Sequence, residues 1–290
     1  MHWQTARFRI DLTNPKVMGI VNVTPDSFAD GGRHADIKAA LAHCERLLAQ
    51  GADLLDIGGE SSRPGAVPLP LEEETRRVLP VVREAVKLGV PISVDTCKPE
   101  VMQAVLDEGA DIVNDIRSLI VPGSVECLAA NPRAGVCLMH MQGTPASMQD
   151  GPRYADVIDQ VAQFLKARCA ALVAAGILAD RIVLDPGIGF GKSVEHNVAL
   201  LAKQRALLAL GRPLLVGWSR KSTLGALTGR AVDDRLAASI AAALAAIQRG
   251  ASIVRVHDVA ATVDALKVWR AAGLGTASWH NARIDDTGTS

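Results

Sequence analysis

Polar residues that could do chemistry follow a series of short apolar runs along the chain. They stand at the ends of these runs, at Asn22, Glu60–Arg63, Asp95, Asn114, His140, Asp185, Ser219–Ser222, Arg255 and His257. In a parallel α/β barrel, reactive groups stand where each strand runs into the loop that follows it. Any single polar residue at such a point could be only a cap, because turns are polar in all proteins. Polar groups follow all of these runs, and together they include carboxylates, amides and cations. This combination indicates a site for a polar ligand.

Two of these segments offer groups that suit an anion. Arg255 and His257 are two residues apart, so on a strand their side chains point to the same side. Arg supplies forked donors and His adds a proton or a hydrogen bond, which suits an anion; a strand-end ion pair with Asp258 is the alternative. Lys221, followed by Ser222 and a predicted helix, also suits an anion or a carbonyl oxygen.

Three other residues suit a heterocyclic ligand. Asp95, Asn114 and Asp185 supply two carboxylates and an amide. A carboxylate can accept from two adjacent N–H donors in one plane, as on the edge of a guanidine-like ring. The alternative is that these groups are structural and bind nearby backbone. His140 lies between two methionines and is expected to be a satisfied core residue, since no His or Cys spacing in the sequence is typical of zinc.

The elements that must position these residues alternate in type. Short β-branched runs predict strands at 17–21, 54–57, 91–94, 112–113, 136–139, 181–184, 214–216 and 252–256. Ala- and Leu-rich stretches predict helices that include 36–50, 71–88, 124–130, 154–175 and 233–249. Eight such pairs with nearly continuous apolar strands predict a single (β/α)8 TIM barrel in residues 1–272. An open doubly wound sheet is disfavoured because no Gly-x-Gly-x-x-Gly motif follows the first strand.

Length and composition exclude several classes of function. Of 290 residues 49% are hydrophobic, yet no run reaches the roughly 20 apolar residues of a membrane span. Lys and Arg (31) balance Asp and Glu (31), and aromatic residues are 3%, so neither nucleic acid nor membrane is an expected partner. The five cysteines form no Cys-x-x-Cys pair and Met1–Arg7 lacks a signal-peptide core, so we expect a reduced, cytoplasmic protein. Residues 273–290 are polar and are expected to form a flexible tail.

Several segments resemble the signatures of the dihydropteroate synthase family. Met18–Phe28 is similar to the first signature of that family, and Asp56–Gly65 (DIGGESSRPG) resembles the second. Shorter segments continue the match in family order: Ser93–Thr96, Val113–Ile116, Leu184–Gly187, Ser219–Ser222 and Arg255–Val259. The resemblance implies a (β/α)8 transferase of folate biosynthesis that requires Mg²⁺. Such an enzyme joins 6-hydroxymethyl-7,8-dihydropterin diphosphate to 4-aminobenzoate, giving 7,8-dihydropteroate and diphosphate.

The resemblance also assigns roles to residues of this chain. Four would hold the pterin edge: Asp95, Asn114, Asp185 and Lys221. Arg255 would lie against the pterin face and bind diphosphate with His257, and Asn22 would be the ligand of Mg²⁺. Five would line the aminobenzoate position: Ser62, Arg63, Pro64, Phe190 and Ser222, with Phe28 on a mobile loop above them.

This chemistry needs no conventional nucleophile. If the C–O bond to diphosphate breaks first, the protein must stabilise a pterin cation and an anionic leaving group, then admit a neutral amine. Four residues are expected to be catalytic: Asp95 toward the cation, Lys221 at the pterin edge, and Arg255 and His257 toward the diphosphate. Ser62 replaces the usual Thr, and Ile188 and Trp218 also depart from the family pattern, but none of the three removes a reacting group. The loop around Arg63–Pro70 carries no extra residue pair, so sensitivity to sulfonamides, which mimic aminobenzoate, is expected.

Two other functions share parts of this pattern. A pterin-binding methyltransferase would keep Asp95, Asn114 and Asp185. It would not need the Ser62–Arg63 pair, Lys221 or the Arg255 and His257 pair, and the Thr24–Phe28 segment also argues against it. A catalytically silent pterin-binding protein would differ only in lacking turnover. The family suggests a homodimer, for which the Ala-rich stretch 236–247 is a candidate face; it could equally be an ordinary inward-packed helix.

Overall fold

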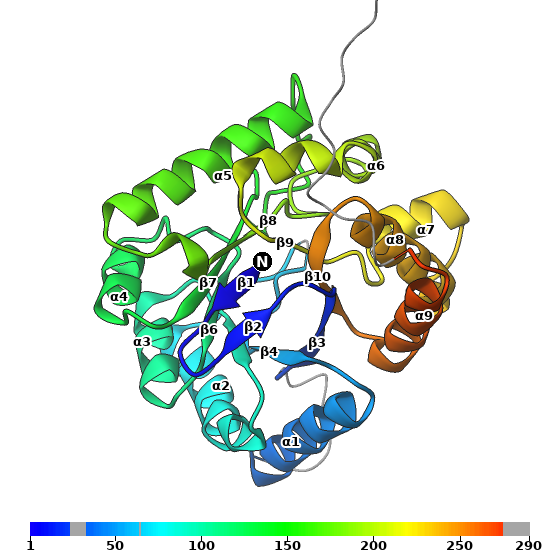
Figure 1. The fold of residues 1–290 in the computed structure, drawn as a ribbon. Helices are drawn as coiled ribbons and strands as arrows, with labels where there is room; N and C mark the ends of the chain where they lie inside the picture. The colour runs from blue at the N-terminus through cyan, green and yellow to red at the C-terminus, as the bar shows by residue number, and fades with distance from the viewer. Residues whose placement is uncertain (24–32, 64, 275–290) are drawn as a thin grey trace, which may run out of the picture.

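The computed structural model describes residues 1–23, 33–63 and 65–274, in which eight parallel strands form a closed barrel surrounded by helices (Figure 1). The strands are β3 (Lys16–Asn22), β4 (Leu54–Gly58), β5 (Ile92–Asp95), β6 (Ile112–Asp115), β7 (Gly135–Met139), β8 (Ile182–Asp185), β9 (Leu214–Val216) and β10 (Ala251–Val256). Neighbours in the barrel are consecutive in the chain, and β10 closes the ring by pairing with β3. The predicted TIM barrel is confirmed, and the open sheet is wrong.

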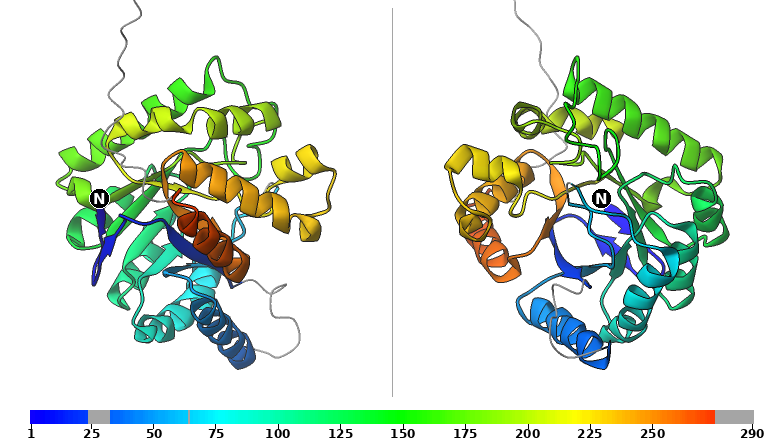
Figure 2. Two further views of the ribbon diagram at one scale, coloured as in Figure 1. Left: turned by 45° about the vertical axis from the view of Figure 1, so that its right-hand side comes forward. Right: turned by 180° about the vertical axis from the view of Figure 1, so that it is seen from behind.

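Helices cover the outside of the barrel (Figure 2). They are α1 (Arg33–Ala49), α2 (Leu71–Ala85), α3 (Pro99–Asp107), α4 (Ser124–Ala130), α5 (Val157–Ala174), α6 (Val194–Ala202), α7 (Ser222–Thr228), α8 (Leu236–Gln248) and α9 (Val259–Ala271). Short 3-10 helices are η2 (Val86–Leu88), η3 (Ala179–Arg181), η4 (Gln204–Leu210) and η5 (Val232–Asp234). The helix expected from residue 154 begins later, because the Asp156 side chain accepts hydrogen bonds from the amides of Ile158 and Asp159 and so caps it.

An N-terminal hairpin, which the sequence analysis did not predict, covers the amino-terminal end of the barrel (Figure 1). Its strands β1 (His2–Gln4) and β2 (Arg9–Asp11) are antiparallel. Trp3 is fully buried, and its indole Nε1 donates a 2.8 Å hydrogen bond to the carbonyl of Arg181. The hairpin packs on an apolar layer inside the barrel: Met18, Leu54, Ile112, Cys137, Val183, Leu215 and Ile253. Strands of three residues are too short for alternation to predict them.

Above this apolar layer the inside of the barrel becomes polar. Side chains of a strand alternate between its two faces, so the residue two positions further along faces the same way. The successive inward residues are Leu54 and Asp56, Ile112 and Asn114, Val183 and Asp185, and Ile253 and Arg255. The strands therefore carry their polar groups to the carboxyl-terminal end of the barrel, where loops surround them.

The outward residues of the same strands form a second core beneath the helices. Leu55 and Ile57 of β4, for example, belong with Val78, Val81 and Val82 of α2 to one cluster of buried side chains. This core fixes the strands and hence the polar groups at their ends. The assignment of residues 1–272 to one domain stays a prediction, and residues 275–290 of the expected tail lie outside the described part of the chain.

Candidate active site

Asp56 lies at the centre of the polar layer. It is fully buried and accepts hydrogen bonds from Ser93 Oγ (2.6 Å), Asn114 Nδ2 (3.0 Å) and Arg255 Nε (2.6 Å). The Nη2 of Arg255 also donates to Asp95 Oδ2 at 3.0 Å. Three of the predicted site residues, Asp95, Asn114 and Arg255, are thus brought together. No role for Asp56 was predicted from the sequence, although its inward register two residues after Leu54 is a signal that indicates one.

Asp185, the second predicted carboxylate, is the last residue of β8. Asp185 is buried, and its Oδ1 accepts a 2.7 Å hydrogen bond from the amide of Gly187. Lys221 faces the same loop, with its Nζ 4.1 Å from the centroid of the Phe190 ring. Gly189 has a φ of +80° and lies so close that a Cβ there would be 3.1 Å from Lys221 Cδ. The loop after β8 therefore packs Phe190 against the ammonium of Lys221.

Burial sets the charge state of this pair. It raises the pKa of Asp185 to about 6, although the Gly187 hydrogen bond and the charge of Lys221 oppose the rise. It lowers the pKa of Lys221 to about 8, although Asp185 opposes the fall. Both groups are charged at neutral pH, but each pKa lies only about one pH unit from neutrality. Small changes of pH around neutrality are therefore able to alter the site.

His257 is held beside the polar layer as a neutral side chain. Its amide donates to Ser219 Oγ at 3.2 Å, and its Nδ1 lies 3.0 Å from the same oxygen. Burial and the charge of Arg255 lower the pKa of His257 to about 4. Asp258 pairs with Arg220 (Nη2 to Oδ1, 2.5 Å), so the alternative in which Asp258 forms the ion pair of Arg255 is wrong. The imidazole can therefore give a hydrogen bond to an anion, but not a full positive charge.

The pKa of Asp95 differs from that of an exposed aspartate. Burial raises its pKa, the charge of Arg255 opposes this, and the neighbouring carboxylate of Asp56 adds to the rise. The pKa of Asp95 is thereby raised to about 7, so this carboxyl is only partly charged at neutral pH, and its charged form would act strongly on a nearby ligand in this dry setting. Its side chain is 11% exposed and lines a pocket with residues of the loop after β4.

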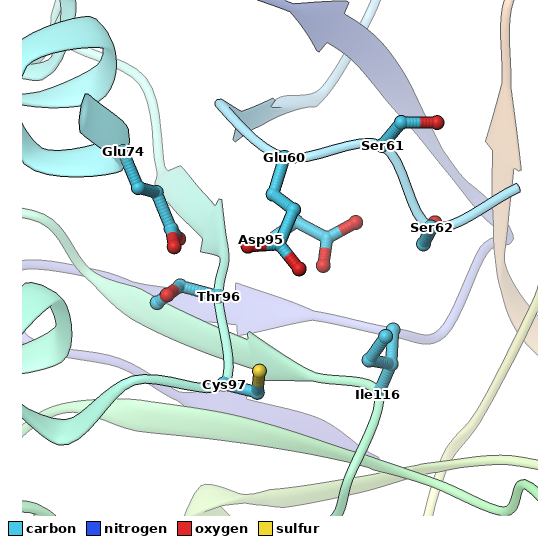
Figure 3. A pocket seen from close by; sticks show the side chains of 8 residues that line it. All are labelled: Glu60, Ser61, Ser62, Glu74, Asp95, Thr96, Cys97 and Ile116. Carbon is cyan, nitrogen blue, oxygen red and sulfur yellow. The ribbon is translucent and has the colours of Figure 1, made fainter. Parts of the chain in front are cut away.

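A pocket connects Asp95 with the loop after β4 (Figure 3). It is lined by Glu60, Ser61, Ser62, Glu74, Asp95, Thr96, Cys97 and Ile116. Ser62 is half-buried, whereas Arg63 and Ser222 are exposed and, within the described residues, make no hydrogen bond to the polar layer. Pro64 and the Thr24–Phe28 segment, to which roles were also assigned, lie outside the described residues.

Lys192, for which no role was predicted from the sequence, organises the loop after β8. It is buried, and its Nζ lies 2.9 Å from His140 Nδ1 and donates to the carbonyls of His140, Gly187 and Phe190. Burial and the charge of Lys192 lower the pKa of His140 to about 3, so this imidazole accepts the bond as a neutral ring. The prediction that His140 is a satisfied core residue is confirmed.

Comparison with known proteins gives the family. The family described as pterin binding enzyme matches residues 18–257. A dihydropteroate synthase of Neisseria meningitidis serogroup B is 55% identical over 94% of this chain and 98% of its own length. The chain belongs to the dihydropteroate synthase family.

Solved members of the family have the same fold. A Burkholderia cenocepacia dihydropteroate synthase complexed with 7,8-dihydropteroate is 50% identical with a TM-score of 0.86, and the match covers 94% of this chain and 96% of that one. A Yersinia pestis dihydropteroate synthase in a sulfonamide drug complex is 46% identical with a TM-score of 0.89, covering 94% and 99%. The family signatures recognised in the sequence are therefore correct, and the methyltransferase interpretation is not supported.

The Mg²⁺ that the family implies has one predicted protein ligand. Asn22 ends β3, where it pairs with Gly58 of β4. Among the described residues no group of three or more His, Cys, Asp or Glu could hold a metal ion. Mg²⁺ commonly keeps several waters and binds through one or two protein oxygens plus substrate phosphates. The amide oxygen of Asn22 fits an ion that arrives with a diphosphate, rather than one held in a protein cage.

Proposed function

We propose that this protein, as a dihydropteroate synthase, joins 6-hydroxymethyl-7,8-dihydropterin diphosphate to 4-aminobenzoate. The observation that carries the proposal is the polar layer, in which Asp56, Asp95 and Asn114 meet Arg255 at one end of the barrel. A buried set of acceptors beside cations suits a ligand with an N–H-rich ring at one end and an anion at the other. The bound product of the Burkholderia relative supports the same reaction.

The pterin would lie with its N–H edge on the buried acceptors. Asp185 and Asn114 are 7% and 5% exposed, so their polar atoms are free of competing bulk water. A carboxylate can accept from two adjacent ring donors at once, which orients the ring as well as holding it. Lys221 would donate to the acceptor side of the ring, and the Arg255 guanidinium would lie against its face.

The diphosphate would be held by Arg255 and His257 on β10 and the loop after it. The neutral imidazole of His257 supplies a hydrogen bond and Arg255 supplies charge. Asn22 would hold Mg²⁺ at the neighbouring end of β3, and bound Mg²⁺ would offset the charge that builds on the leaving group. Strands β3 and β10 are paired, which supports placing these groups around one anion.

The reaction would proceed in two bond changes. The C–O bond to diphosphate breaks, and its electron pair leaves on the diphosphate oxygen. The nitrogen of 4-aminobenzoate then forms the C–N bond to the same carbon, and its extra proton passes to the released diphosphate or to water. Asp95 would stabilise the pterin cation between these steps through its charge, which is effective because the site is dry and the group is already in place.

The aminobenzoate would lie toward the mouth of the barrel. Ser62, Arg63, Pro64, Phe190 and Ser222 are the residues proposed to line its position. Arg63 is a partner of suitable charge for the carboxylate, and its charge adds to the lowering of the pKa of His257 by burial and by the larger effects of Arg255 and Arg220. A sulfonamide would compete for this position, as the Yersinia relative bound to such a drug supports.

The protein is further proposed to act as a cytoplasmic homodimer. In the described residues no helix is long and apolar enough to cross a membrane. The five cysteines are free thiols, which suits a reducing compartment. The α8 helix buries Ala242, Ala243 and Ala246 toward the barrel, whereas Leu236 at its start is 43% exposed. Light scattering of the purified protein, alone and as Leu236→Asp, tests the dimer.

Diphosphate release from the purified protein is the deciding test. The pterin diphosphate and Mg²⁺ are supplied with and without 4-aminobenzoate, and dihydropteroate is identified by mass spectrometry. Release that requires aminobenzoate and yields dihydropteroate is expected. Pterin binding in a calorimeter without any release would favour the catalytically silent binding protein instead. Absence of pterin binding would overturn the site.

A further inference from the structure

An ion-pair cluster lies beside the polar layer and has no part in the chemistry proposed above. The ammonium of Lys98 is hydrogen-bonded to Glu60 Oε2 and to Glu74 Oε2. These residues come from three different segments: the loop after β4, the first turn of α2, and the residue that precedes α3. We call Lys98, Glu60 and Glu74 the Lys98 cluster. Figure 3 shows Glu60 on its loop and Glu74 on its helix, on the side of the pocket that leads to Thr96.

The cluster fastens the loop that joins β4 to α2, here residues 59–63 and 65–70. Glu60 Oε2 also accepts a 3.1 Å hydrogen bond from the amide of Leu69, which closes the base of the loop. The Nη1 of Arg77 donates to the carbonyl of Gly59 at 3.2 Å. Gly59 itself packs so tightly on α2 that a Cβ would be 2.7 Å from Val78 Cγ1. Between these attachments the loop carries Ser62 and Arg63.

The charges in the cluster depend on one another. Glu74 is 1% exposed, and its Oε1 has no hydrogen-bond partner among the described residues. A buried carboxylate in that state relies on its cation, here Lys98, with help from the N-terminus of α2. Burial by itself lowers the pKa of Lys98, but the hydrogen bonds and charges of both glutamates outweigh it and raise that pKa. The ammonium is therefore a fixed positive charge holding two carboxylates.

The cluster also links the two parts of the substrate site. Lys98 follows Asp95 by three residues, with Thr96 and Cys97 lining the pocket between them. We call the loop that joins β4 to α2 the aminobenzoate loop, because it carries Ser62 and Arg63. A movement of Lys98 would therefore move the aminobenzoate loop relative to the strand end that carries Asp95. Glu60, Glu74 and Asp95 all line that pocket (Figure 3).

We propose that Lys98 is a positioning residue that sets the aminobenzoate loop against the pterin site by bridging Glu60 and Glu74. This inference rests on the proposed function for the identity of the substrate. It makes Lys98 important for the second substrate and not for the first. The pterin acceptors Asn114 and Asp185, and Asp56, which supports Asn114, make no hydrogen bond to the cluster among the described residues.

The test compares Lys98→Met with Lys98→Arg and with the control Lys87→Met. Lys87 forms a similar bridge to Glu84, but on the exposed surface of α2 and η2. Three quantities are measured: KM for 4-aminobenzoate, the Kd of the pterin diphosphate by calorimetry, and hydrogen exchange of the Leu69 amide. Lys98→Met/Glu74→Gln, which removes both buried charges, replaces the single variant if that one does not fold.

Lys98→Met is expected to raise KM for 4-aminobenzoate by about tenfold or more, because the loop loses its register with the bound pterin. The Kd of the pterin should change by less than about twofold, as expected for a site without shared partners. Hydrogen exchange at the Leu69 amide should become faster in Lys98→Met. Lys98→Arg should keep KM and the exchange rate close to the wild-type values, because the forked guanidinium of arginine can bridge two carboxylates. Lys87→Met should change neither KM nor the exchange rate.

Other results would overturn the inference. An unchanged KM in Lys98→Met would show that the cluster does not position the aminobenzoate loop. A parallel rise in the pterin Kd would assign Lys98 a general structural role. A wild-type protein that forms no dihydropteroate would overturn the proposed function and this inference with it, whereas an active wild type with an unaffected Lys98→Met overturns the inference alone.

Discussion

Arg255 and Asp56 are 199 residues apart in the sequence, yet Arg255 Nε donates a 2.6 Å hydrogen bond to Asp56 Oδ2. The contact crosses the inside of the barrel between β10 and β4, which are separated around the ring by β3. Asp56 also accepts a hydrogen bond from Asn114, so one buried carboxylate fixes both Arg255, which is proposed to bind the diphosphate, and Asn114, which is proposed to bind the pterin. The two ends proposed for the first substrate therefore share a single support.

Removing the charge of Asp56 is expected to weaken both stability and pterin binding. Asp56→Asn keeps the shape, but leaves one of the donors from Ser93, Asn114 and Arg255 without an acceptor. We expect a loss of about 1–3 kcal/mol in the free energy of unfolding, measured by urea denaturation, because a buried polar group loses its partner. The pterin Kd should rise by at least about tenfold, since 1.4 kcal/mol of lost orientation corresponds to that factor.

Asp264→Asn is the matched control, because its ion pair with Lys267 is exposed. That variant should leave both the urea midpoint and the pterin Kd unchanged. A pterin Kd that stays the same in Asp56→Asn would mean that Asn114 and Arg255 do not depend on this carboxylate.

Asp95 is expected to act on the transition state more than on binding. Asp95→Asn retains an acceptor for Arg255 but removes the negative charge. We expect kcat to fall by about 10²–10³-fold, the usual effect of deleting one electrostatic group at a reacting centre. Steady-state kinetics and calorimetry on the same preparation separate kcat from pterin affinity. If kcat barely falls while the pterin still binds, Asp95 does not stabilise a cation.

Pterin binding should be strongest in a window between about pH 6 and pH 8. The pKa of Asp185 is raised to about 6, so below that pH the carboxyl is protonated and no longer accepts from two ring donors. The pKa of Lys221 is lowered to about 8, so above that pH its charge is lost. Calorimetric Kd values across this range test both limits.

Lys221→Arg provides the check on the alkaline limit. Arginine keeps its charge at every pH of the experiment, so the loss of affinity above about pH 8 should disappear. An alkaline limit that persists in Lys221→Arg would belong to another group or to the ligand.

Sulfonamides are expected to inhibit competitively with 4-aminobenzoate, and Phe190 should affect both ligands alike. Phe190→Ala removes the ring that lies against Lys221. We expect KM for 4-aminobenzoate and Ki for a sulfonamide to rise together by about tenfold, which corresponds to the lost apolar contact of one ring. Phe8→Ala, whose ring faces Arg7 in the N-terminal segment, is the control. Unequal changes in the two constants would place the ligands at different positions.

Much of the site was predictable because a parallel barrel puts function at the ends of its strands. Asp95, Asn114, Asp185 and Arg255 each lie at or next to the last residue of a strand, where a run of apolar residues ends. The period of two along a strand then places them on the inner face. These are local regularities, so a single sequence carries them.

The groups that support the site were harder to predict because their partners are far away in the chain. Lys192 reads as part of a glycine-rich turn, yet it is buried with its ammonium on three carbonyls and His140. Lys98 and Glu74 read as ordinary helix-terminal charges, and only the packing of α2 beside α3 brings them together. The hairpin of β1 and β2 was missed for the same reason, since Trp3 finds its partner at Arg181.

The hairpin also has a kinetic consequence. It seals the amino-terminal end of the barrel, so both substrates must share the opposite mouth. The pterin acceptors lie deep, whereas Ser62 and Arg63 stand near the surface. A 4-aminobenzoate molecule that bound first would block the path of the pterin to its deeper position. We therefore expect ordered binding, with the pterin diphosphate entering the site before 4-aminobenzoate.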